Sequence, residues 1–274
     1  MKLQPDQVEK PLRKLRMQLN ALPPNPRPEE VHSLRMYTRR LEATIAAMAL
    51  EREKKARCLL KLIKSVRKAA GEVRDMDVLI GNVLTICGHQ GCGPAVRLVE
   101  HLAKMRARNA RRLHRLVRRE RREFSTRLKQ SSRLIRKKMK NGVADREGET
   151  PPQILITELS HWPSLDEGNL HLFRIRVKEL RYMLQLNEQA DARLVDALGE
   201  VKDTVGEWHD WVELEKIARK VLDPRSDGDL LKRIRLTGGE KLQIALAAAI
   251  RVRERYFHLP DARKAGVKIL QMAS

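Results

Sequence analysis

Residues 31–41 read Val-His-Ser-Leu-Arg-Met-Tyr-Thr-Arg-Arg-Leu, and residues 170–180 return to the same pattern as Leu-His-Leu-Phe-Arg-Ile-Arg-Val-Lys-Glu-Leu. At a constant offset of 139 positions, three basic or histidine positions recur: His32 and His171, Arg35 and Arg174, and Arg39 and Lys178. A recurrence at this long spacing indicates two related halves in one chain rather than a series of short repeats.

A second repeat follows each copy of the first. Residues 71–75, Gly-Glu-Val-Arg-Asp, recur as residues 206–210, Gly-Glu-Trp-His-Asp, at an offset of 135. The two offsets differ by four residues, which is about one helical turn. We therefore predict that one helical unit has been duplicated.

Helical geometry explains the spacing inside each motif. Successive residues of an α-helix are ~100° apart, so the histidine and the basic residues of each copy share one face. Apolar residues occupy the neighbouring face, which predicts an amphipathic helix with one buried and one basic side. Residues 28–30, Pro-Glu-Glu, predict the start of the first motif helix, and a capping box from Ser164 to Glu167 predicts the start of the second.

The composition predicts an all-α protein. The chain is rich in Leu and Ala, only 3% of its residues are aromatic, and no segment alternates β-branched residues as strands do. It contains no apolar run of the ~20 residues that a membrane helix needs, and its three cysteines form no disulfide framework. We expect a soluble, cytoplasmic protein that has no membrane partner.

Proline and glycine positions divide the chain. We expect a first half over residues 1–140, a linker over 141–152 and a second half over 153–274. Breakers such as Gly71, Gly206 and the Gly238-Gly239 pair predict helix ends, whereas residues 95–140 contain neither Gly nor Pro and predict one helix or two nearly collinear helices.

The net charge of +22 is confined to the first half, which has 36 Lys and Arg against 13 Asp and Glu. Residues 101–140 alone have 17 basic and 2 acidic residues. The basic residues form a stripe along one side of the expected helix. We predict that five of them form an additional basic surface: Arg108, Arg111, Arg115, Arg118 and Arg122. Like charges without interspersed acids destabilise a helix, so the stripe predicts a polyanionic partner.

Catalytic or metal chemistry is weakly indicated. Cys87, His89 and Cys92 offer three ligands in a glycine-rich loop, whereas structural zinc sites use four. Asp75, Asp77 and Asp210 could act as bases or hold magnesium, but we expect them to cap helices or brace arginines. Trp208 and Trp211 are expected in the core. We predict no catalytic residue, no metal site and no cofactor.

Taken together, these motifs resemble the CHAD domain, a histidine-bearing all-α family. The resemblance is carried by His32-x-x-Arg35-x-x-x-Arg39-Arg40, by its second copy from His171 to Arg181, and by the two Gly-Glu-x-x-Asp segments. It implies two four-helix bundles related by a pseudo-twofold axis, with a basic channel between them that binds inorganic polyphosphate without catalysis. The channel residues implied by the resemblance are His32, Arg35, Arg39, Arg40, His171, Arg174, Lys178 and Arg181. Each copy lacks one basic residue that the other copy has: Glu42 stands at the position equivalent to Arg181, and Glu179 stands at the position equivalent to Arg40.

Three hypotheses about function follow. The first is a polyphosphate-binding module, associated with polyphosphate granules, for which nucleic acid is a non-specific competitor; its affinity should fall with salt and rise with acidity. The second is a general nucleic-acid-binding protein that uses the stripe on residues 101–140. The third is a metal-dependent phosphohydrolase that uses Asp75 or Asp210. The sequence does not predict the oligomeric state.

Overall fold

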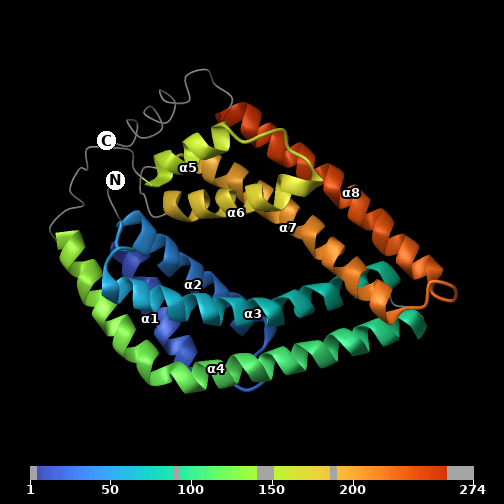
Figure 1. Cartoon of the computed structure of the whole chain (residues 1–274), viewed down its shortest axis with the longest axis horizontal. Helices are drawn as coiled ribbons and strands as arrows, with labels where there is room; N and C mark the ends of the chain where they lie inside the picture. Colours follow the sequence, from blue (N-terminus) through green and yellow to red (C-terminus); the bar gives the residue numbers. More distant parts are fainter. Residues whose placement is uncertain (1–4, 89–92, 141–150, 186–189, 258–274) are drawn as a thin grey trace.

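The computed structural model describes residues 5–88, 93–140, 151–185 and 190–257. In these ranges the chain is all-α and has no strand, as its composition predicts (Figure 1). The helices are α1 Pro5–Ala21, α2 Pro28–Ala47, α3 Lys54–Cys87, α4 Gly93–Lys140, α5 Pro151–Ser160, α6 Glu167–Leu184, α7 Ala192–Val221 and α8 Gly228–Val252, followed by a π-helical turn, Arg253–Phe257. None of them is long and apolar enough to span a membrane.

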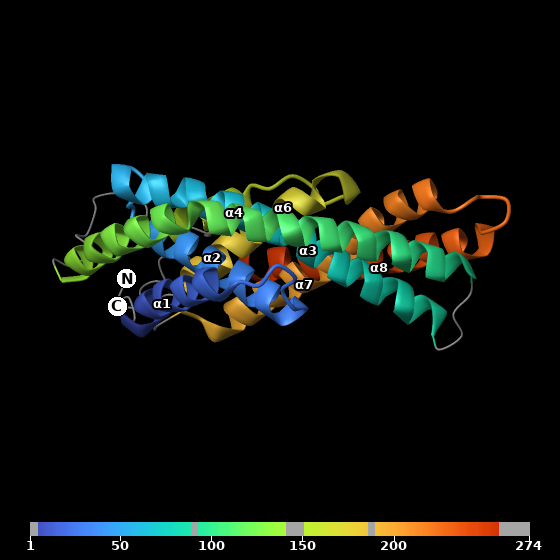
Figure 2. The same ribbon diagram turned by 90° about the horizontal axis from the view of Figure 1, so that it is seen from below.

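The helices are arranged as two sets that meet along α2, α3, α6 and α7. In the first set α3 packs lengthwise on α4, while α1 packs on α2 and α4; in the second set α7 packs lengthwise on α8, and α5 packs on α6. The sets contact each other where α2 meets α6 and where α3 and α4 meet α7. Seen from below, the assembly is elongated and flat (Figure 2).

Three separate apolar clusters hold this arrangement together. One joins α1, α2, α3 and α4 around residues such as Leu34 and Ile63. The second joins α5, α6, α7 and α8 around Phe173 and Leu198. The third joins the distant ends of α3 and α4 to those of α7 and α8, and includes Trp211. Each set of helices thus has its own core, and a third core is shared by both. The division into two halves and the pseudo-twofold relation between them stay predictions.

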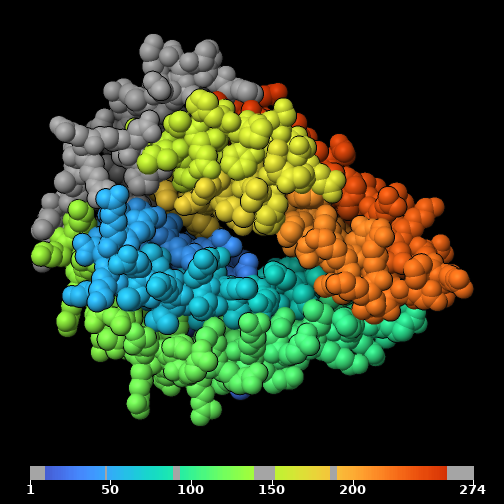
Figure 3. Space-filling model, viewed as in Figure 1, coloured from blue at the N-terminus to red at the C-terminus, as the bar shows by residue number. Residues whose placement is uncertain are grey.

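The three clusters leave a polar region in the middle of the molecule. The space-filling view is hollowed there, between α6 and α7 on one side and α2 and α3 on the other (Figure 3). We call this region the central hollow. The four helices around it are the ones that carry the duplicated motifs.

Several predicted helix boundaries are wrong. Gly71 and Gly206 lie inside the continuous helices α3 and α7, and residues 238–239 lie inside α8. The expected capping box at Ser164 is also wrong, because Asp166 is the N-cap of α6 and accepts a hydrogen bond of 2.9 Å from the backbone N–H of Asn169.

Other boundaries agree with the sequence. α2 begins at Pro28, and residues 93–140 form one helix, which bends in Figure 1. Most of the predicted linker, residues 141–150, lies outside the described residues, and its last two residues, Pro151 and Pro152, begin α5.

Candidate functional site

The two motif helices place their basic residues on the side that is not packed into the apolar cores. Leu34 and Leu41 of α2, like Phe173 and Leu180 of α6, are fully buried and fix the rotation of each helix. The remaining side of each helix carries the histidine and the basic residues, as the 3.6-residue period predicts. Basic side chains from both halves are therefore directed toward one region.

Lys178 shows how closely these charges approach one another. Only 8% of its surface is exposed. Burial is the largest cause that lowers the pKa of its amine to about 6, and the neighbouring charges of Arg174, Arg39, Arg35 and Arg67 contribute to the same shift. These four arginines belong to α6, α2 and α3, so three helices contribute cations around one amine.

The motif arginines lie against glycines of the next long helix. The Arg35 guanidinium contacts α3 at Gly71, and the Arg174 guanidinium contacts α7 at Gly206, so closely that a methyl group at either glycine would overlap it. Arg174 Nε also donates a hydrogen bond of 2.8 Å to the carbonyl oxygen of Lys202. Glycine is needed at these positions because a side chain would exclude the guanidinium.

The second motif supplies two aspartates to the same region. The pKa of Asp210 is raised to about 6: burial is the largest cause, Arg174 opposes the shift, and Asp75 contributes to it. Burial likewise raises the pKa of Asp75, although its residue surface is exposed. The charges of the two copies therefore act on each other. No hydrogen bond or ion pair among the described residues joins Asp75 or Asp210 to an arginine, so their bracing role stays a prediction.

The histidines lie beside the α3 and α7 groups of the second motif. The rings of His171 and His209 have centroids 4.2 Å apart. Burial lowers the pKa of His171 to about 4, followed by the effect of His209. Burial and then Arg74 lower the pKa of His32. Arg74 and His209 are equivalent in the two repeats, so each motif histidine has a basic or imidazole neighbour at the same position.

Two of the predicted residues stand apart from this group. Arg40 is half-buried, and no described contact of its side chain joins it to the hollow. Arg181 lies two turns beyond Arg174 on α6 and packs on α7 in the same way. The Arg181 guanidinium contacts Gly199, and Arg181 Nε donates a hydrogen bond of 3.2 Å to the carbonyl oxygen of Val195. The other six predicted residues are close enough for their charges to act on members of the same group: His32, Arg35, Arg39, His171, Arg174 and Lys178.

Four further residues belong to the site and were missed from the sequence: Arg67 and Arg74 on α3, and Lys202 and His209 on α7. Arg67 donates a hydrogen bond of 2.9 Å to Glu42. The signal was present, because Arg67 and Lys202 each stand four residues before the repeated glycine, on the same side of the helix.

The predicted stripe on α4 lies elsewhere. Arg108, Arg111, Arg115, Arg118 and Arg122 are all exposed on α4, and no carboxylate among the described residues lies within ion-pair distance of any of them. They are on the solvent side of α4, because its opposite side packs on α3 through residues such as Leu102 and Leu113. The stripe is therefore a second basic surface, separate from the hollow.

Other sequence motifs have structural roles where they can be seen. Trp208 and Trp211 are 4% exposed and belong to the core, as expected. Asp77 pairs with Arg106 at 2.5 Å, which joins α3 to α4. His89 and Cys92 lie outside the described residues, and within the described part of the chain no group of three or more His, Cys, Asp or Glu side chains is placed to hold a metal ion.

Comparisons with known proteins agree with the geometry. The model of the CHAD domain family matches residues 6–219, which include both motif helices and most of α7. The match ends before α8. A search of curated proteins finds no match to the chain.

Proposed function

The chain belongs to the CHAD domain family, which is associated with polyphosphate binding, and we propose that its central hollow binds inorganic polyphosphate. The supporting observation is the group of cations around Lys178, drawn from α2, α3 and α6. Such a group destabilises the free protein, because each charge is partly desolvated and repels the others. A bound polyanion reverses that repulsion.

The chemistry of the hollow favours phosphate groups. Arginine makes bidentate hydrogen bonds to phosphate oxygens, and lysine supplies a compact charge. The two aspartates neutralise only part of the cationic charge in the free protein. We also propose that the chain binds without catalysis and that it acts in the cytoplasm, at polyphosphate granules.

A competition experiment tests the proposal. Long-chain polyphosphate should displace a labelled DNA duplex from the protein at physiological salt, and the double variant Arg174→Gln/Lys178→Gln should weaken polyphosphate binding by tenfold or more. A matched control is Arg108→Gln/Arg115→Gln, which replaces two basic residues on the solvent side of α4. Equal losses in the two variants, or duplex DNA outcompeting polyphosphate by a wide margin, would contradict the proposal.

The exposed α4 stripe supports a second candidate, non-specific nucleic-acid binding. Its phosphate contacts would be independent of the hollow. This candidate requires that alanines at Arg111, Arg115, Arg118 and Arg122 abolish DNA binding, while changes at His32 and His171 leave it unchanged. DNA binding that survives the four alanines would exclude it.

A further inference from the structure

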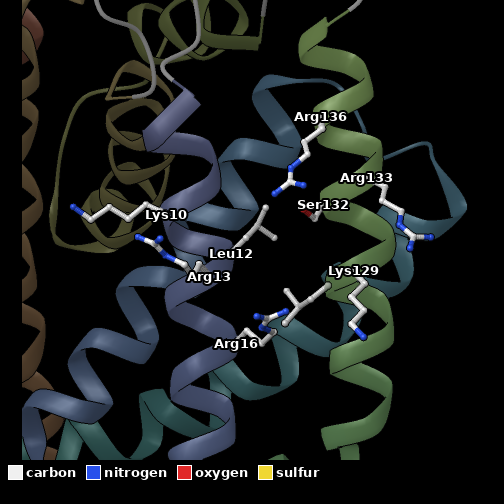
Figure 4. A pocket seen from close by; sticks show the side chains of 9 residues that line it. Lys10, Leu12, Arg13, Arg16, Lys129, Ser132, Arg133 and Arg136 are labelled. Carbon is white, nitrogen blue, oxygen red and sulfur yellow. The ribbon is translucent and has the colours of Figure 1, made fainter.

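A recess of about 560 Å3 lies between α1 and α4, outside the central hollow. Its lining residues are Lys10, Leu12, Arg13, Arg16, Leu128, Lys129, Ser132, Arg133 and Arg136. Figure 4 shows Arg16 and Arg136 extending into the space between the two helices, with Ser132 on the α4 side. Below, this recess is called the α1–α4 groove.

The groove is lined by cations from both helices. Three come from α1 and three from α4, and no acidic residue is among its lining residues in the described part of the chain. The basic residues of α1 follow one another at three-residue intervals, so they span ~9 Å of helix; those of α4 span ~10.5 Å. In Figure 4 Lys10 and Arg13 point away from α4 and Arg133 points away from α1, so Arg16 and Arg136 are the cations directed into the space between the helices. Like charges so close along two neighbouring helices repel one another, and an anion is the ligand that relieves this repulsion.

This feature is not part of the duplication. In the second half α5 precedes and packs on α6, as α1 precedes and packs on α2. The sequence of α5, Pro-Pro-Gln-Ile-Leu-Ile-Thr-Glu-Leu-Ser, contains no Lys or Arg. The motif cations around the hollow, in contrast, occur in both halves. The charge of the α1–α4 groove is thus an independent property of the first half, which also carries all of the excess positive charge of the chain.

The shape and lining of the groove define what fits it. Packed helices have axes ~8–10 Å apart, and a DNA duplex, whose major groove alone is ~12 Å wide, is too broad to enter between them. Among the described residues no aromatic side chain lines the groove to stack a nucleobase. The other lining residues are Leu12 and Leu128, and Ser132, whose hydroxyl can donate a hydrogen bond to a phosphate oxygen.

We propose that the α1–α4 groove is a second site for an extended single chain of phosphates, separate from the central hollow. The choice of ligand rests on the proposed function, since the same polymer serves both sites. A short chain fills each site independently, so two short chains bind per protein. A chain long enough to reach both sites gains affinity because the second contact is intramolecular.

The test is a calorimetric titration of the full chain with tripolyphosphate at low salt. The groove variant is Arg13→Gln/Arg16→Gln/Arg133→Gln, and the hollow variant is Arg174→Gln/Lys178→Gln. The control, Arg108→Gln/Arg111→Gln/Arg115→Gln, removes three exposed charges from α4 outside the groove. Thermal unfolding verifies that each variant is folded. Because the groove and control positions are exposed, we expect these variants to change the unfolding temperature only slightly.

We expect two sites in the wild type and in the control, and one site in each of the other variants. One site in the wild type, lost only in the hollow variant, overturns the groove and leaves the proposed function intact. One site lost only in the groove variant supports the groove and refutes the hollow. A groove variant that loses affinity for a DNA duplex, yet keeps both tripolyphosphate sites, also overturns the proposal.

Discussion

Replacing Lys178 with methionine should stabilise the free protein. The pKa of a lysine amine is 10.5 when it is unperturbed and about 6 at this position, so folding at pH 7 requires the amine to lose its proton. Each pKa unit is worth ~1.36 kcal/mol, and the 3.5 units between pH 7 and 10.5 therefore cost about 5 kcal/mol. Methionine has a similar length and no charge, so Lys178→Met removes this cost.

The sign of the effect can be followed with pH. A depressed lysine pKa destabilises the folded state most below pH 6, and the destabilisation disappears as the pH approaches 10.5. The gain in unfolding free energy from Lys178→Met should therefore shrink to about 2 kcal/mol at pH 9. The same variant should lose about tenfold in polyphosphate affinity at pH 5.5, where the wild-type amine is charged.

Urea denaturation at pH 7 and pH 9 measures the stability, and calorimetry at pH 5.5 measures the affinity. Lys61→Met is the matched control, because Lys61 is exposed on α3 and its replacement should change stability by less than ~0.5 kcal/mol. The reasoning is refuted if Lys178→Met is no more stable than the wild type at pH 7, or if its gain is as large at pH 9 as at pH 7.

Three further predictions concern the same region. The pKa of Lys178 without ligand is about 6, and the amine should have a higher pKa in the complex, so its contribution to the affinity should decline as the pH rises from the first value to the second. Calorimetry in buffers of different ionisation enthalpy should show that binding takes up protons. A constant affinity from pH 6 to 9 would contradict this. Gly71→Ala or Gly206→Ala should displace the arginine packed on the glycine and weaken binding about tenfold. The control is Gly81→Ala on α3, where the added methyl group meets open space; it should leave binding unchanged and stabilise the fold by up to ~1 kcal/mol. Equal effects at the three glycines would be evidence against this packing role. Asp210→Asn should strengthen binding at pH 8, where the carboxylate is charged, and change little at pH 5, below its pKa of about 6; the same change at both pH values would exclude an electrostatic cause.

The all-α class and the positions of the motif helices could be predicted because both depend on local periodicity. Leu34 and Leu41 repeat at helical spacing, and that spacing alone determines which side of α2 is buried. The same rule placed Arg35 and Arg39 on the opposite, basic side. Six of the eight predicted residues lie in one group of interacting charges for this reason.

The glycines show where local rules fail. Gly71 and Gly206 were read as helix ends, because glycine lowers helix propensity by ~1 kcal/mol. Each is instead the point where a guanidinium from another helix approaches the backbone, and this contact is between residues far apart in sequence. The α1–α4 groove was missed for a similar reason, because the position of Arg13 beside α4 depends on how the helices pack.

The arginine contacts along α7 also set a length scale. Arg174 rests on Gly206 and Arg181 on Gly199, so one guanidinium recurs with every seven residues of two antiparallel helices, or ~10.5 Å of rise. A relative of this chain could lengthen or shorten this row of arginine contacts in steps of that size by gaining or losing a matched arginine and glycine, without any change in its loops. Helix register, rather than loop insertion, would then be the means by which such proteins are tuned to polymers of different extent.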